Sequence, residues 1–373
     1  MTQFSHNDAQ DTIEPLNAQS PQQPLLEVKN LKMHFAIKQG VFAKVAGYTK
    51  AVDDVSFNLY KGETVGLVGE SGCGKTTIGR CIARAYQPSS GQVLFHNDAE
   101  VTDLSKLHGK ALKPIRQDVR MIFQDPFSSL NPRMTVFDIL AEVLKVNKLF
   151  TGKALEERVK ELLNLVGLRP EYLRRYPHAF SGGERQRLVI ARAIATNPKL
   201  VIADEATAAL DVSIRAQILN LLAELQQELG LTYLFVSHDL SVVRHICDRV
   251  QVMYVGKLVE SAPTEQLFAR PRHPYTEALL SAVPISNPRQ RGARKHLRLK
   301  GEIPDPANPP SGCYFHLRCP YATDICQQQA PELKIIASDH SVACHHAEQL
   351  TLSGALYADD AEHEVALTEQ VTV

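Results

Sequence analysis

A glycine-rich loop between an expected strand and an expected helix restricts the fold of this 373-residue chain more than any other feature. The run at 63–69 is apolar like a buried strand, and residues 75–86 repeat apolar side chains along one helix face. The loop that joins them, Gly69-Glu-Ser-Gly-Cys-Gly-Lys75-Thr76-Thr77, has the spacing of a phosphate-binding loop. A strand that leads through such a loop into a helix predicts an α/β fold.

Further apolar runs at 119–124, 200–203 and 233–236 predict more strands of the same sheet, and a helical stripe at 214–225 separates the last two. Strands that are apolar throughout belong to a parallel sheet covered by helices on both faces. Ligands of such sheets gather at the carboxyl ends of the strands. We therefore expect the functional residues directly after Val68, Phe123, Ala203 and Val236.

The glycine-rich loop predicts binding of a nucleoside triphosphate. Glycines let backbone N–H groups surround a polyphosphate, and the helix that follows adds the positive end of its dipole. Lys75 would contact the outer phosphates, and the Thr76 hydroxyl would ligate Mg²⁺. The residues expected to contact the nucleotide here are Gly69, Ser71, Gly72, Cys73, Gly74, Lys75, Thr76 and Thr77.

Two further patterns indicate hydrolysis. The apolar run at 200–203 ends in two acids, of which Asp204 suits a magnesium contact and Glu205 suits a general base that polarises water. Ser181, Gly182 and Gly183 precede an expected helix and form a second anion-binding turn. Because one chain needs only one such turn for its own triphosphate, we expect the second to serve another nucleotide.

Composition excludes several classes of protein. The chain has 41 basic and 41 acidic side chains, and this zero net charge argues against dedicated nucleic-acid binding. We see neither a secretory signal nor an apolar run of the roughly 18 residues that a membrane span requires. The chain is therefore expected to be intracellular and to meet a membrane only through a partner. Residues 1–24 and the acidic stretch 346–373 are expected to be disordered tails.

Together these motifs resemble the ATP-binding cassette of ABC proteins over residues 25–262. The resemblance implies a RecA-like parallel sheet, an antiparallel β subdomain and a helical subdomain inserted at about 125–180. It identifies Gln124 as the Q-loop residue that contacts Mg²⁺ and the lytic water, and His238 as the switch histidine. The signature motif would be Ser181 to Gln186, and Asp211 would belong to the D-loop. Phe35 would be the aromatic residue that stacks on adenine, with Tyr48 as the alternative.

Residues 263–345 resemble the C-terminal extension of ATPases from peptide permeases. This implies an ATPase that powers an importer of di- or oligopeptides; nickel, glutathione or antimicrobial-peptide import is the alternative. The implied partners are a second, non-identical ABC ATPase, two transmembrane permease subunits and, indirectly, an external peptide-binding protein. The implied location is peripheral, on the cytoplasmic face of the inner membrane. Rival readings are a soluble ABC ATPase acting on ribosomes or DNA, and an iron–sulfur protein whose cassette only senses ATP.

Four cysteines, Cys313, Cys319, Cys326 and Cys344, stand in a segment with little apolar content. Thiolates in such a segment indicate a metal that replaces the missing core. Zinc and a [4Fe–4S] cluster both suit four cysteines, and the spacing alone does not choose between them. Because the resembled family includes members with a [4Fe–4S] cluster here, we expect this cluster, with zinc or no metal as the alternatives.

Overall fold

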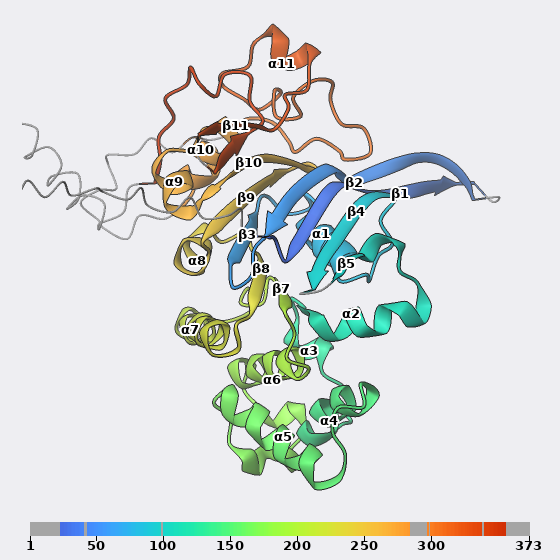
Figure 1. Ribbon diagram of the computed structural model, residues 1–373. Coiled ribbons are helices and arrows are strands. Elements are labelled where there is room, and N and C mark those ends of the chain that lie inside the picture. Colours follow the sequence, from blue (N-terminus) through green and yellow to red (C-terminus); the bar gives the residue numbers. More distant parts are fainter. Residues whose placement is uncertain are drawn as a thin grey trace, which may run out of the picture.

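Two sheets and a helical lobe make up the protein in the computed structural model (Figure 1). The structure describes residues 23–40, 43–97, 100–283, 297, 299–337 and 339–355, so the expected tail at 1–24 lies almost wholly outside the described residues. Eight strands form the larger sheet in the order β11-β12-β10-β9-β3-β8-β7-β6. Four strands form the smaller sheet in the order β2-β1-β4-β5.

The parallel part of the larger sheet confirms the fold class expected from the apolar runs. Its strands, in spatial order, are β9 (Arg249–Tyr254), β3 (Thr64–Val68), β8 (Thr232–Val236), β7 (Leu200–Asp204) and β6 (Val119–Ile122). Each pairs in parallel with its neighbour, so that their carboxyl ends share one edge. The site expected after Val68, Ala203 and Val236 is therefore a single region.

Both faces of this sheet are buried, which explains its uniformly apolar strands. Along β7, Leu200 and Ile202 face one core while Val201 and Ala203 face the other, because successive side chains of a strand point in opposite directions. The first core contains α1 (Lys75–Ile82) and the smaller sheet. The second contains α6 (Gly182–Ile194), α7 (Val212–Leu229) and α8 (Leu240–Ile246).

The smaller sheet is the antiparallel β subdomain that the resemblance implied. Its strands are β1 (Leu26–Gln39), β2 (Lys44–Leu59), β4 (Ser90–Asn97) and β5 (Glu100–Asp103). Helix α1 is shorter than the expected 75–86: it ends at Ile82, and Arg84 adopts a left-handed backbone with φ of +55°. The turns η1 (Leu104–Lys106) and η2 (Gly109–Ala111) and helix α2 (Leu112–Asp118) then lead into β6.

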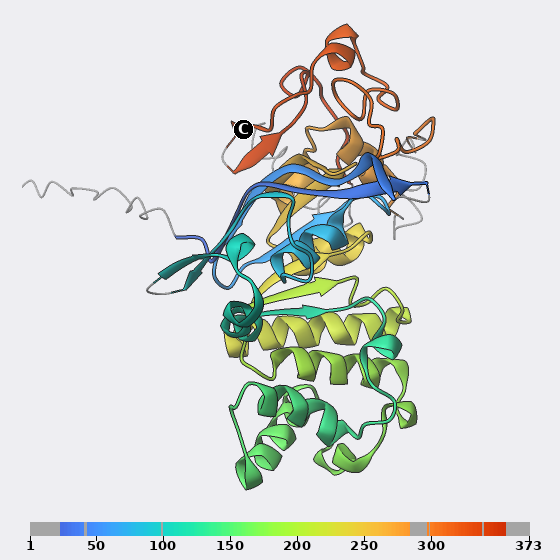
Figure 2. The ribbon, with the colours of Figure 1, turned by 90° about the vertical axis from the view of Figure 1, so that its right-hand side faces the viewer.

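A helical lobe is inserted between β6 and α6, at the end of the molecule opposite the C-terminal region (Figures 1 and 2). It contains α3 (Pro126–Ser129), α4 (Val136–Val146), α5 (Gly152–Leu165) and the turns η3 (Pro170–Arg174) and η4 (Pro177–Ala179). Thr135 and Asp138 form a capping box that starts α4, and Gly167, with φ of +67°, follows the end of α5. The lobe occupies the range expected for the helical subdomain.

The C-terminal region continues the larger sheet instead of forming a separate unit. Strand β10 (Lys257–Pro263) pairs with β9 on one side and with β12 (His340–Val342) on the other, and β11 (Lys334–Ala337) pairs with β12. Helices α9 (Thr264–Ala269), α10 (Pro274–Ser281) and α11 (Asp324–Gln328) complete this region. Among the described residues, no helix combines the length and the apolar character needed to cross a bilayer.

The expectation of a disordered tail from residue 346 is wrong for residues 346–355. Leu352 and Ala355 are buried, the Ser353 amide donates to Glu277 over 2.8 Å, and the Ala355 amide donates to the Phe268 carbonyl over 2.7 Å. These contacts offset the entropy lost on ordering, which the acidic composition alone did not reveal. The rest of that stretch, 356–373, lies outside the described residues.

A buried carboxylate fastens the C-terminal region to β10, and its removal gives the first prediction. Glu260 is fully buried; it accepts hydrogen bonds from the amides of Arg272 (2.6 Å) and His273 (3.0 Å) and lies 2.7 Å from His340 Nε2. Glu260→Ala leaves all three groups without this acceptor, so we expect the free energy of unfolding to fall by about 3 kcal/mol. Thermal unfolding of the purified chain measures the loss.

The matched control is Glu332→Ala, which removes an exposed carboxylate 3.9 Å from Lys334. Because an exposed pair contributes little, we expect this change to stay within about 0.5 kcal/mol. Equal unfolding midpoints for the two variants would show that Glu260 does not fasten the region.

Candidate functional site

Three glycines let the loop after β3 pass close to its neighbours. Their φ values are +149° at Gly69, +79° at Gly72 and +107° at Gly74, a range that side chains rarely permit. A Cβ at Gly69 would lie 2.2 Å from the Met253 backbone oxygen, and one at Gly74 would lie 2.0 Å from that of Ala51. At Gly72 a Cβ would meet nothing within 4 Å among the described residues. Close contacts with neighbouring backbone thus exclude a side chain at Gly69 and Gly74, whereas at Gly72 only the backbone angle disfavours one.

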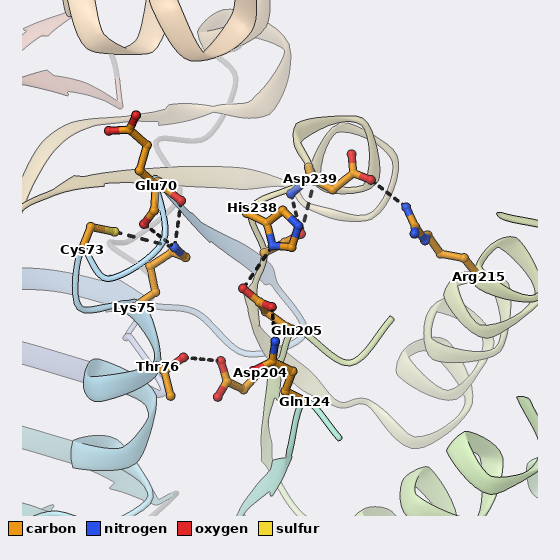
Figure 3. Close-up of polar contacts among 12 residues, drawn as sticks. Glu70, Cys73, Lys75, Thr76, Gln124, Asp204, Glu205, Arg215, His238 and Asp239 are labelled. Atoms are coloured by element: carbon orange, nitrogen blue, oxygen red, sulfur yellow. Dashed lines mark hydrogen bonds and ion pairs between the residues drawn. The ribbon is translucent and has the colours of Figure 1, made fainter. Parts of the chain in front are cut away.

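The side chain of Lys75 is held inside this loop. Its ammonium group donates to the Gly69 carbonyl over 2.8 Å and to the Glu70 carbonyl over 2.9 Å, and Cys73 Sγ lies 3.7 Å away (Figure 3). The residue is buried at the amino end of α1. A fixed positive charge beside backbone N–H groups and a helix N-terminus is suited to bind phosphate.

The carboxyl end of β7 brings the first predicted acid to the helix that follows this loop. Thr76 Oγ1 donates to Asp204 Oδ1 over 2.8 Å, which joins α1 to β7 (Figure 3). Asp204 is buried, and this burial raises the pKa of its carboxyl group, while the Thr76 hydrogen bond opposes the rise. A hydroxyl and a carboxylate in this arrangement are ligands of the type that Mg²⁺ prefers.

The second acid is held by two side chains from neighbouring strand ends. Gln124 Nε2 donates to Glu205 Oε2 over 2.7 Å, and His238 Nδ1 lies 3.1 Å from Glu205 Oε1 (Figure 3). Glu205 has a left-handed backbone with φ of +48°, and its amide donates to the Val236 carbonyl over 3.0 Å. The structure therefore brings together Gln124, Glu205 and His238, which the sequence predicted to act together.

Sequence reasoning missed Arg215, which connects two loops beside this group. Its guanidinium donates to Asp239 Oδ2 over 2.8 Å and to the Leu210 carbonyl over 3.3 Å (Figure 3). Asp239 directly follows His238, and Leu210 precedes Asp211 of the predicted D-loop. No local pattern predicts this pair, because it joins α7 to the loop after β8.

The Ser181 loop is built as the amino end of a helix. Ser181 Oγ accepts from the Glu184 amide, and the Glu184 carboxylate accepts from the Ser181 amide over 2.9 Å, which is a complete capping box at the start of α6. A Cβ at Gly183 would lie 2.7 Å from the Ile214 side chain, so this loop packs closely against α7. Gly182 and Gly183 are only partly buried and keep backbone accessible.

Two residues predicted to contact nucleotide lie in unexpected surroundings. Gln186 is buried, with 1% of its surface exposed. The Phe35 ring packs edge-on against Tyr86, with ring centres 5.5 Å apart, whereas Tyr48 is 52% exposed. Asp211, in contrast, is exposed at the start of α7. The residue that stacks on adenine thus stays a prediction.

The four predicted cysteines line one small cavity, together with His273, Phe315 and Tyr321. All four are free thiols. Burial raises the pKa of Cys313 to about 11 and that of Cys319 to about 12, and neighbouring thiols add to both shifts. Within the described residues, no three His, Cys, Asp or Glu side chains are already arranged to hold a metal ion. The donors for a metal are therefore gathered, although not in coordinating positions.

Two known families match separate parts of the chain. Residues 52–208 match the family described as ABC transporter, and residues 259–326 match the C-terminal region of oligopeptide/dipeptide transporters. The chain is 53% identical to the oligopeptide transport ATP-binding protein AppF of Bacillus subtilis, over 87% of this chain and 98% of that protein. It is 49% identical to a probable peptide ABC transporter ATP-binding protein of Sinorhizobium fredii, over 86% and 89%.

Solved structures with the same fold are ABC cassettes. A bacterial ABC transporter cassette solved as a dimer superimposes with a TM-score of 0.56 at 28% identity, covering 64% of this chain and 98% of that one. The cbiO1 protein of Clostridium perfringens, part of an ABC transporter complex, gives a TM-score of 0.55 at 28% identity, covering 66% and 90%.

The raised pKa of Asp204 predicts that its charge destabilises the folded protein at neutral pH. A carboxyl whose folded pKa is raised costs stability once the pH exceeds the pKa of the unfolded chain, and the cost is complete above the folded pKa. Without nucleotide and magnesium, we expect Asp204→Asn to raise the unfolding temperature at pH 7 by a few degrees, on the order of 1 kcal/mol. The gain should shrink as the pH falls below the folded pKa and be lost at a pH well below the ordinary value of 3.8. Differential scanning calorimetry at both pH values measures it.

The control is Asp211→Asn, because Asp211 is exposed and makes no capping hydrogen bond through its side chain. It should not alter the unfolding temperature. A lower unfolding temperature for Asp204→Asn at pH 7 would contradict the prediction.

Proposed function

The chain belongs to the ATP-binding subunits of ABC transporters, in the branch that carries the oligopeptide/dipeptide C-terminal region, and on that premise we propose that it powers import of di- or oligopeptides. It is an ATPase. The observation that carries the proposal is the convergence of the glycine loop, Asp204 and the Gln124–Glu205–His238 group at one sheet edge. The match to a peptide-transport ATPase over nearly its whole length supports the substrate class.

The glycine loop and Lys75 bind the phosphates of ATP. The ammonium group is already held within the loop by the Gly69 and Glu70 carbonyls, so its position is set before the phosphates arrive. Thr76, Asp204 and Gln124 would hold Mg²⁺, which neutralises negative charge on the phosphates. Asp204 meets Thr76 directly and can exchange this hydrogen bond for a magnesium contact. The other nucleotide contacts of the loop come from Gly69, Ser71, Gly72, Cys73, Gly74 and Thr77.

Glu205 acts as the general base. Gln124 and His238 each contact one of its oxygens, and these contacts fix the direction of the carboxylate. A base held in one orientation accepts a proton from water as that water attacks the terminal phosphate. His238, whose side chain is 58% exposed, is free to contact that phosphate from the solvent side.

Two cassettes meet head to tail, so that the Ser181 loop of one chain completes the nucleotide site of the other. The capping box presents the amino end of the 13-residue helix α6, which favours an anion. Asp211 lies exposed beside the same face and contacts the partner cassette. The dimeric form of a similar solved cassette supports this arrangement. We propose that the partner is a related, non-identical ATPase.

The helical lobe receives the membrane subunits. Three large apolar side chains are exposed on it, namely Val146 at 61%, Leu149 at 41% and Tyr176 at 42%. Exposed apolar groups on one lobe suit a protein contact. The chain would thus lie at the cytoplasmic face of the inner membrane, bound to two permease subunits, and an external peptide-binding protein would deliver the cargo. It needs no nucleic acid.

Cys313, Cys319, Cys326 and Cys344 would hold a [4Fe–4S] cluster, with zinc as the alternative. The four sulfur donors suit both groups in chemistry, and loading either one would have to move the thiols into coordinating positions. The bound group would cross-link loops that have little apolar core. Because burial keeps the Cys313 and Cys319 thiols protonated at neutral pH, loading must release protons, as is usual for cysteine sites.

Metal content tests this assignment. We expect the chain purified without oxygen to contain about four iron and four sulfide per chain, with visible absorption that Cys319→Ser abolishes. Cys247→Ala, which removes a thiol outside the cavity, should leave the iron content unchanged. If the protein contained one zinc per chain and no sulfide, the site would be assigned to zinc instead of the cluster. If it contained neither iron nor zinc, the proposal of a metal site would be wrong.

The Glu205→Gln variant tests the proposed role of Glu205 in ATP hydrolysis. In the transporter reconstituted with its copurified membrane subunits, we expect ATP turnover to fall by about a hundredfold or more while MgATP binding is retained. Glutamine keeps the size and the contacts to Gln124 and His238 but cannot accept the proton. Phosphate release and uptake of labelled di- and oligopeptides into vesicles measure the effect, with Glu332→Gln as the control.

Unchanged peptide uptake in the Glu205→Gln transporter would favour a cassette that only senses ATP. If the unmodified transporter took up nickel but not peptides, the assignment as an ATPase would stand and the proposed substrate would be wrong.

A further inference from the structure

The second residue of the glycine loop points away from the site and into the C-terminal region. Figure 3 shows the Glu70 side chain directed away from Lys75. Its oxygens accept two hydrogen bonds from Arg318, one of 2.6 Å from Nη1 and one of 2.9 Å from Nη2. A two-pronged contact between guanidinium and carboxylate fixes both groups in distance and in angle. The side chain of Arg318 is only 7% exposed, so water screens this pair weakly.

The backbone of Glu70 is held by the same region. Its amide donates to the Tyr275 hydroxyl over 2.8 Å, and Tyr275 is fully buried in α10. The rings of Tyr254, Tyr275 and Phe315 pack against one another, with centres 4.7 to 5.4 Å apart. The Arg318 guanidinium lies 5.8 Å from the centre of the Tyr254 ring. Side chain and main chain of this loop residue are therefore both fixed by residues beyond 253.

Arg318 is itself positioned by a turn that begins and ends at cysteines of the cavity. The His316 amide donates to the Cys313 carbonyl over 3.0 Å, and the Cys319 amide donates to the His316 carbonyl over 3.3 Å. The Arg318 amide donates to the carbonyl of Phe315, which is buried. Any change in the cysteine-lined turn is thus transmitted to the guanidinium.

The Glu70 carbonyl connects this anchor to phosphate binding. It accepts from Lys75 over 2.9 Å, beside the 2.8 Å contact to Gly69. Movement of Glu70 would shift an acceptor that sets the position of the lysine and of the loop amides next to it. Phosphate affinity depends on groups that are held in place before the ligand arrives.

We propose that Arg318 is a positioning residue for ATP binding, and that through Glu70 it links the cysteine-lined C-terminal region to nucleotide affinity. This inference rests on the proposed function of the glycine loop. Because coupling between two sites is reciprocal, bound ATP also stabilises the turn at 313–319. The C-terminal region thereby acts on the nucleotide site of its own chain.

The test is a double-mutant cycle on the transporter complex. We expect Arg318→Ala to raise the Kd for MgATP by about tenfold, as measured with a fluorescent ATP analogue in competition with MgATP. The KM for ATP should rise in parallel while kcat at saturating ATP changes little, because Arg318 does not touch the reacting atoms. Arg318→Lys keeps the charge but not the two-pronged contact and should fall between. Glu70→Ala should weaken binding similarly, and the double variant no further.

The control is Asp305→Ala, which removes the 2.8 Å acceptor of the Ala307 amide within the same C-terminal region without touching the loop or the cysteine-lined cavity. It separates a general loss of stability from loss of the Arg318 contact, and should leave the Kd unchanged. Should Arg318→Ala fail to fold, Glu70→Gln tests the same pair from the cassette side. MgATP affinities equal to the unmodified protein, or strictly additive losses, would overturn the inference. An unmodified complex that binds no MgATP would instead refute the proposed function.

Discussion

The nucleotide site depends on how closely the loop after β3 passes the backbone of its neighbours. Cβ atoms at Gly69 and Gly74 would lie 2.2 Å and 2.0 Å from backbone oxygens of Met253 and Ala51, which belong to β9 and β2. The loop is thus clamped between both sheets, and Lys75 is bound to its carbonyls. Because the strands are buried on both faces, this clamp cannot relax without disturbing two cores.

One core joins the parts of the molecule that must work together. The cluster of buried side chains on one face of the larger sheet extends from Leu162 in the helical lobe to Phe315 in the C-terminal region. The smaller sheet packs on α1 in a core of its own. Rigid packing transmits displacement, so the helical lobe and the turn that carries Arg318 are both coupled by direct packing to the nucleotide site.

Local patterns predicted the parallel sheet and the two acids at its edge because both follow from short-range rules, whereas Gln124 and His238 were identified through the resemblance to ABC cassettes. Apolar runs identify strands buried on two faces, and the polar residues after them, such as Asp204 and Glu205, must then share one edge. Pairings between distant segments have no local signal, as the bond between Glu70 and Arg318 shows. Burial likewise has no signal in a motif: Gln186 follows the Ser181 loop along the chain, yet the structure buries it, and its nucleotide contact stays a prediction.

The pairing of β12 with β10 changes which strand forms the edge of the larger sheet. Were the polypeptide to stop after β10, that strand would lose its backbone pairing at Glu260 and Ser261, and the Glu260 carboxylate would lose its imidazole neighbour. Exposed strand edges of this kind can pair with other chains and promote aggregation. With β12 and β11 in place, the border is instead a four-residue strand with the exposed cation of Lys334. The supposed appendage therefore protects the sheet against self-association.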